Sequence, residues 1–116
     1  VDIFAGLYGV CSFQYEVCVL DATLAELDGI VSDKKASAKN RRAASLGLQL
    51  LKAKEVKVIK SHRKVFKSTD KAILDFAAAN RDLVVVATQD KELREKLRAK
   101  GVSVVVLRQK QYLVLL

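Results

Sequence analysis

Apolar and polar residues follow two kinds of pattern along this chain, one typical of helices and one typical of strands. Apolar side chains recur three and four positions apart in four segments, which predicts a helix within residues 1–14 that Gly9 ends, and helices at residues 41–54, 69–80 and 90–100. A shorter helix is predicted from Asp21 or Thr23 through Ile30. Runs rich in valine and leucine or isoleucine predict strands at residues 16–20, 55–59, 83–88 and 102–107. Alternation of the two kinds predicts an α/β fold with a mostly parallel sheet and right-handed crossovers.

Local signals mark several ends of these segments. Gly101 follows the helix at 90–100 and suits the left-handed residue that often comes after a helix. Residues 109–116 end in an apolar run, which predicts that the tail packs on the sheet or pairs with it. Proline, repeats and low-complexity linkers are absent from the sequence, so residues 1–116 are predicted to form a single domain.

The composition narrows the class of protein. Hydrophobic residues make up 51% of the 116 residues, which is too many for a disordered chain. The sequence contains no apolar run near the ~20 residues that cross a bilayer, so we expect a cytoplasmic protein with no membrane partner. Cys11 and Cys18 match no common zinc spacing, and Cys18 is predicted to be a small buried residue.

A net charge of +8 favours a polyanionic partner, with RNA or DNA the leading candidates. Basic residues gather in and beside two predicted loops, where they can contact phosphates without reading the base sequence. The candidate nucleic-acid contacts are Lys34, Lys35, Lys39, Arg41, Arg42, Arg63, Lys64 and Lys67. The alternative is that each of these groups is only a solvated face.

Three acidic residues fall where a parallel α/β fold places its chemistry. Asp90 follows the strand at 83–88, Asp70 opens the helix at 69–80, and Glu26 lies on the helix after the first visible strand. Active sites of open parallel sheets lie outside the carboxyl ends of the strands. Carboxylates gathered there repel one another, and Mg²⁺ or Mn²⁺ would remove that cost, activate a water and stabilise charge on a phosphate. Thr88 would orient a carboxylate or the water.

Each acidic residue also has a simpler explanation. Asp70 after Thr69, and Asp90 after Thr88 and Gln89, are suited to capping helices. Glu26, taken alone, is explained as a solvated helix residue. Other chemistries have less support. His62 is the single histidine and lies in a basic loop, so a nucleophile–histidine triad could form only through it. A glycine-rich phosphate loop is absent from the sequence.

The segments that carry these acids resemble the PIN domain, a family of metal-dependent ribonucleases. They are residues 22–27 (ATLAEL), 69–74 (TDKAIL) and 86–93 (VATQDKEL), and residues 105–113 (VVLRQKQYL) resemble an archaeal branch related to the nuclease of small-subunit ribosomal RNA processing. The resemblance implies a three-layer α/β/α domain in which Glu26, Asp70 and Asp90 hold the metal. The family opens with a strand that ends in a further aspartate. This chain begins VDIF, as inside a helix, so we expect that strand to be missing from it.

The resemblance implies an endoribonuclease that uses Mg²⁺ or Mn²⁺ and acts in ribosomal RNA processing or as a toxin–antitoxin ribonuclease. Because the first aspartate has no match, a non-catalytic RNA-binding or scaffolding module is the main alternative. A small α/β domain for protein–protein interaction, with incidental acidic residues, is the third. Without the first strand the centre of the sheet would be open, which makes a homo-oligomer or strand exchange plausible.

Overall fold

The α/β fold class predicted from the sequence is confirmed. The computed structural model describes residues 2–61 and 68–116, and its contacts divide the chain into two compact units. The central unit comprises residues 16–69, and the terminal unit comprises residues 1–15 and 70–116. The described strands form one two-stranded and one three-stranded sheet. A single domain over residues 1–116, with one central sheet that lacks its first strand, stays a prediction.

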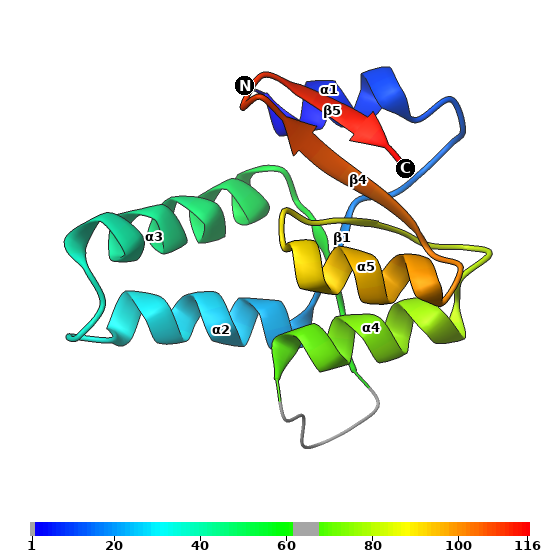
Figure 1. The fold of residues 1–116 in the computed structure, drawn as a ribbon. Helices are drawn as coiled ribbons and strands as arrows, with labels where there is room; N and C mark the ends of the chain where they lie inside the picture. The colour runs from blue at the N-terminus through cyan, green and yellow to red at the C-terminus, as the bar shows by residue number, and fades with distance from the viewer. Residues whose placement is uncertain (1, 62–67) are drawn as a thin grey trace. The chain divides into compact units, whose positions relative to one another are not determined.

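The central unit combines a short parallel strand pair with two helices (Figure 1). Strand β1 (Cys18–Leu20) pairs with β2 (Lys57–Ile59), and Leu20 is its buried residue. Between them come α2 (Asp21–Ser32) and α3 (Ala38–Ala53). Cys18 was predicted to be buried, and this is wrong, because β1 has only β2 as a neighbour in its sheet among the described residues and the Cys18 side chain is exposed.

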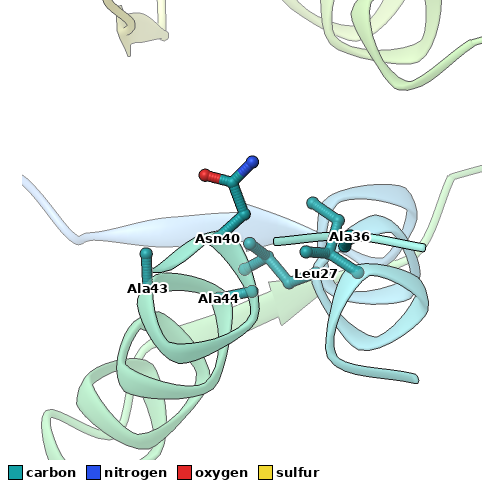
Figure 2. A pocket seen from close by; sticks show the side chains of 6 residues that line it. Leu27, Ala36, Asn40, Ala43 and Ala44 are labelled. Carbon is teal, nitrogen blue, oxygen red and sulfur yellow. The ribbon is translucent and has the colours of Figure 1, made fainter. Parts of the chain in front are cut away.

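Helices α2 and α3 pack against each other through small and aliphatic residues. Ala44 of α3 is 4% exposed and is the buried residue of the pair. An open groove of about 370 Å³ runs between the two helices (Figure 2). It is lined by Leu27, Ile30, Ala36, Asn40, Ala43 and Ala44. Ser37 caps α3, since its hydroxyl accepts a hydrogen bond from the Asn40 N–H at 3.1 Å.

The terminal unit is organised around one buried strand. Strand β4 (Ser103–Arg108) lies between β3 (Val85–Ala87), to which it is parallel, and β5 (Tyr112–Leu115), to which it is antiparallel. The apolar tail therefore pairs with the sheet, as predicted. Val104, Val105 and Val106 are at most 2% exposed, although successive residues of a strand point to opposite faces. Strand β4 is thus buried on both of its faces.

Three helices complete the terminal unit. Helices α4 (Thr69–Ala79) and α5 (Lys91–Ala99) contribute Ala77, Leu93 and Leu97 to the same core cluster as Val104 and Val106. Helix α1 (Ile3–Val10) contacts β5, where its Gly6 lies against Leu113. A Cβ atom at position 6 would come within 2.8 Å of the Leu113 Cδ1 atom, so any larger residue there would have to displace the Leu113 side chain. In the part of the chain that is described, no helix is long and apolar enough to cross a membrane.

Two helices end in the same Schellman motif but with different residues in the left-handed position. After α5, Gly101 has a φ of 81°, and the Val102 N–H donates to the Leu97 carbonyl at 3.0 Å. After α3, Glu55 has a φ of 52°, and the Val56 N–H donates to the Leu51 carbonyl at 3.0 Å. The prediction for Gly101 is confirmed. Glu55 adopts a backbone conformation that glycine adopts more easily.

The β4–β5 turn (residues 108–111) has a similar conflict between residue type and backbone. The Gln111 N–H donates to the Arg108 carbonyl at 3.0 Å, and Gln109 and Lys110 have φ values of 52° and 55°. Two consecutive positive φ values correspond to a type I′ turn, which strongly prefers Asn-Gly. Left-handed backbone costs non-glycine residues roughly 1–2 kcal/mol each. Neither residue has the short side chain that reduces this cost.

Exchanging glycine at the two helix ends should change stability in opposite directions. Glu55→Gly should raise the free energy of unfolding by about 1 kcal/mol, since it removes left-handed strain and an unfavourable negative charge at a helix C-terminus. Gly101→Ala should lower it by about 1 kcal/mol, because a Cβ atom at position 101 would meet only the Arg81 Cδ atom, at an ordinary 3.8 Å, so that the φ value is what opposes a side chain. Urea unfolding measures both. A loss of stability in Glu55→Gly would contradict the assigned motif.

Candidate active site

Asp90 lies at the carboxyl end of β3 and is the N-cap of α5. Its Oδ1 atom accepts a hydrogen bond from the Leu93 N–H at 2.9 Å. Among the described residues, no hydrogen bond engages its Oδ2 atom, and the residue is exposed. The capping explanation for Asp90 is therefore confirmed, but it uses only one of the two carboxylate oxygens. The cap holds the second oxygen in a defined orientation at the end of the strand.

Thr88 and Gln89 attach this end of β3 to the neighbouring strand. The Thr88 N–H donates to the Val105 carbonyl at 3.1 Å, which continues the strand pairing, and its hydroxyl accepts from the Asp90 N–H at 3.2 Å. Thr88 thus orients Asp90 through the main chain. The Gln89 side chain makes two bonds to the backbone of Leu107: its Oε1 accepts from the N–H, and its Nε2 donates to the carbonyl at 3.0 Å.

Asp70 lies at the same edge of the terminal unit as Asp90. It is an exposed residue in the first turn of α4, where the helix dipole favours a carboxylate. Helices α4 and α5 run in the same direction (Figure 1). Because α4 precedes β3 and α5 follows it, both helices begin at the carboxyl end of β3. The structure therefore places two of the three predicted acidic residues, Asp70 and Asp90, at one edge.

Glu26 belongs to the central unit, where it is an exposed residue of α2. Taking the described residues of each unit by itself, no group of three or more histidine, cysteine, aspartate or glutamate side chains lies close enough to hold a metal ion. The set of Glu26, Asp70 and Asp90 draws on both units and stays a prediction.

A fourth carboxylate, Asp21, has a long-range role that was not predicted from the sequence. It follows β1 directly, and both of its oxygens accept the Ser61 N–H at 3.2 Å, just beyond the end of β2. Its Oδ1 atom also accepts from the Ala22 N–H at 2.8 Å. Hydrogen bonds from the Ser61 hydroxyl and N–H lower the pKa of the Asp21 carboxyl below its ordinary value. Asp21 therefore joins the carboxyl ends of the two parallel strands.

The first predicted group of basic residues lies at the start of α3 and in the connection that precedes it. All five are exposed: Lys34, Lys35, Lys39, Arg41 and Arg42. The first turn of α3 contains no acidic residue. Positive side chains at the positive end of a helix dipole repel it, and a bound anion would relieve that repulsion. In the second predicted group, Arg63, Lys64 and Lys67 lie outside the described residues, as does His62.

Comparisons with known proteins agree with this architecture. A family model described as "PIN like domain" matches residues 1–110. Ribonuclease VapC4 of Methanocaldococcus jannaschii is 34% identical over 99 residues, which cover 85% of this chain and 71% of that protein. The resemblance noted from residues 22–27, 69–74 and 86–93 is thereby confirmed at the level of the family.

The Asp21–Ser61 contact should make stability depend on pH. Because the folded-state pKa of Asp21 is lowered, its stabilising effect is present above the ordinary carboxyl pKa, about 4, and is lost as the pH falls through the folded value. Asp21→Asn should therefore destabilise the protein at pH about 7 and much less at pH about 3, as measured by urea unfolding.

The Ser61→Ala background provides the control for this prediction. Since the Ser61 hydroxyl is the largest cause of the lowered pKa, the pH-dependent part of the Asp21→Asn effect should shrink when that hydroxyl is absent. An effect of Asp21→Asn with the same pH dependence in both backgrounds would show that Ser61 does not act on this carboxylate.

Proposed function

Because the chain belongs to the PIN-like domain family, we propose that it is a ribonuclease that hydrolyses RNA phosphodiester bonds with the help of Mg²⁺ or Mn²⁺. The relative named as a ribonuclease supports RNA as the substrate class. The observation that carries the proposal is the position of Asp90, a carboxylate at the carboxyl end of a parallel strand with one oxygen held by a helix cap. This is the edge where open α/β sheets bind their ligands.

The oxygens present suit a hard divalent cation. Such cations prefer carboxylate oxygens, and the described hydrogen bonds leave the Oδ2 atom of exposed Asp90 unengaged. Asp90, Asp70 and Glu26 are proposed to hold the ion. When bound, it would activate a water and stabilise charge on the phosphate during in-line displacement. Thr88 keeps Asp90 in place by accepting its N–H, and the Leu93 N–H fixes the carboxylate orientation.

Phosphate binding is proposed for the basic residues of the chain. Lys34, Lys35, Lys39, Arg41 and Arg42 lie at the N-terminal end of α3 or just before it, where helix N–H groups and side-chain charges would both favour a phosphate. Arg63, Lys64 and Lys67 are proposed for the same role from the sequence alone. These contacts would add affinity without selecting a sequence.

Two cellular roles are compatible with this activity. A toxin–antitoxin ribonuclease is supported by the name of the M. jannaschii relative. A ribonuclease of ribosomal RNA processing is supported by residues 105–113. Either role requires the same carboxylates, so the tests below address the activity that the two roles share.

Replacing the carboxylates by amides should separate capping from catalysis. Asp90→Asn keeps a good N-cap, so the free energy of unfolding should stay within about 0.5 kcal/mol of the wild-type value. Asp90→Ala should lose about 1 kcal/mol. The double variant Asp70→Asn/Asp90→Asn should lower Mn²⁺-dependent RNA cleavage by at least about a hundred-fold, because it removes two negative charges proposed to hold the ion.

RNA binding without metal serves as the control for this double variant. It should be retained, since the carboxylates make no favourable contact with phosphates. Unchanged RNA cleavage in the double variant would contradict the assignment of Asp70 and Asp90 to the active site. A wild-type protein that binds RNA and does not cleave it would instead favour the non-catalytic module.

The charge at the start of α3 should affect stability and RNA binding in opposite directions. Lys39→Glu should raise the free energy of unfolding by about 0.3–1 kcal/mol, because an acidic residue in the first turn favours the helix dipole. The same variant should bind RNA more weakly, with a salt dependence reduced by about 0.7 in slope. Lys52→Glu, in the last turn of the same helix, is the matched control: it should destabilise the helix and leave RNA affinity nearly unchanged. Equal effects of the two variants on RNA affinity would contradict a localised phosphate contact.

A further inference from the structure

The β4–β5 turn lies at the edge of the terminal unit that carries Asp90. In the parallel pair, Ala87 at the end of β3 lies opposite Val105, and β4 then continues for three more residues to Arg108. At about 3.3 Å per residue, the turn begins about 10 Å past the end of β3. Asp90 starts α5 at that same end of β3. Asp90 is also three residues past Ala87, and Gln89 bonds to Leu107, so the turn begins at about the level of Asp90, on the side where a substrate would approach.

Gln89 holds the β4–β5 turn in a defined position relative to Asp90. Its side-chain amide bonds both to the N–H and to the carbonyl of Leu107, the residue just before the turn. The Gln89 side chain therefore makes the two hydrogen bonds to β4 that a further residue of β3 would make through its backbone. Gln89 is also the chain neighbour of Asp90, so the carboxylate and the base of the turn are connected through one residue.

The turn carries positive charge on a backbone that is poorly suited to its residues. All four of its residues, Arg108, Gln109, Lys110 and Gln111, are exposed. In the described part of the chain, neither Arg108 nor Lys110 forms an ion pair, whereas Lys71 and Lys96 each pair with an acid on their own helix. Left-handed Gln109 and Lys110 persist where Asn-Gly would fit better. Local strain of this kind occurs often at ligand-binding positions.

We propose that the β4–β5 turn is a contact for the phosphate backbone of single-stranded RNA, with Arg108 and Lys110 as the binding side chains. The inference rests on the proposed ribonuclease function and adds a contact outside the two basic groups predicted from the sequence. Because Gln89 joins the base of the turn to the residue before Asp90, a strand bound at the turn would pass within a few nucleotides of Asp90.

Fluorescence anisotropy with a labelled single-stranded RNA oligonucleotide, in the presence of a metal chelator, tests this contact. Arg108→Gln/Lys110→Gln should weaken binding by roughly ten-fold at 0.15 M salt and reduce the slope of log K against log salt by about 1.4, the value for two phosphate contacts. Gln109→Gly keeps both charges and relieves one left-handed side chain. It should bind RNA as the wild-type protein does.

Arg98→Gln/Lys100→Gln is the matched control, because it removes two exposed positive charges at the opposite end of α5 from Asp90. It should leave the salt slope unchanged. An equal loss of affinity in both double variants would show that only the net charge matters and would overturn the proposal. An unchanged affinity and slope in Arg108→Gln/Lys110→Gln would also overturn it. Thermal unfolding verifies that each variant is folded.

The binding experiment is independent of the proposed catalytic activity. If the wild-type protein binds RNA through the turn but cleaves none with Mn²⁺, the ribonuclease proposal fails and the turn contact stands. If the protein cleaves RNA while the two turn variants keep wild-type affinity, the turn contact fails and the ribonuclease proposal stands.

Discussion

The parallel pairing of β3 with β4 is the interaction on which the candidate site depends. Strand β4 can lie in the interior because Val104, Val105 and Val106 fill both of its faces with apolar side chains. Because β3 is aligned on this strand, Asp90 occurs at a fixed level beside it, and β4 is long enough to bring the turn to about the same level. The buried valines thus determine where the polar chemistry of the terminal unit is exposed.

Capping and metal binding, which the sequence offered as competing explanations for Asp90, turn out to be compatible. In a capping carboxylate, one oxygen accepts a hydrogen bond from a helix N–H, and the other oxygen stays available to a ligand. The cap also removes rotational freedom from the side chain, so less entropy is lost when an ion binds. The same helix end that needs an acceptor for its N–H groups would therefore preorganise Asp90 as a ligand of the proposed ion.

The sequence predicted features that depend on neighbouring residues better than those that depend on distant ones. Helix and strand positions, Gly101 and the cap at Asp90 follow from local spacing, and the structure confirms them. Asp21 and Ser61 are 40 residues apart in the sequence, and Gln89 and Leu107 are 18 residues apart, so no local sequence pattern predicts either contact. Gln109 and Lys110 are not residue types that favour positive φ, so only the structure reveals their left-handed conformation.

Where local preference and structure disagree, the disagreements fall into two kinds. Glu55 has a positive φ at the end of α3, in the position of the Schellman motif that glycine usually occupies, and no ligand is proposed there. Gln109 and Lys110 have the same left-handed backbone. Their turn carries Arg108 and Lys110, which form no ion pair among the described residues. Natural proteins are expected to break local rules mainly where function requires it. Because Glu55 shows the same strain where no ligand is proposed, the strained backbone of the turn supports the RNA contact only together with the exposed charges of Arg108 and Lys110.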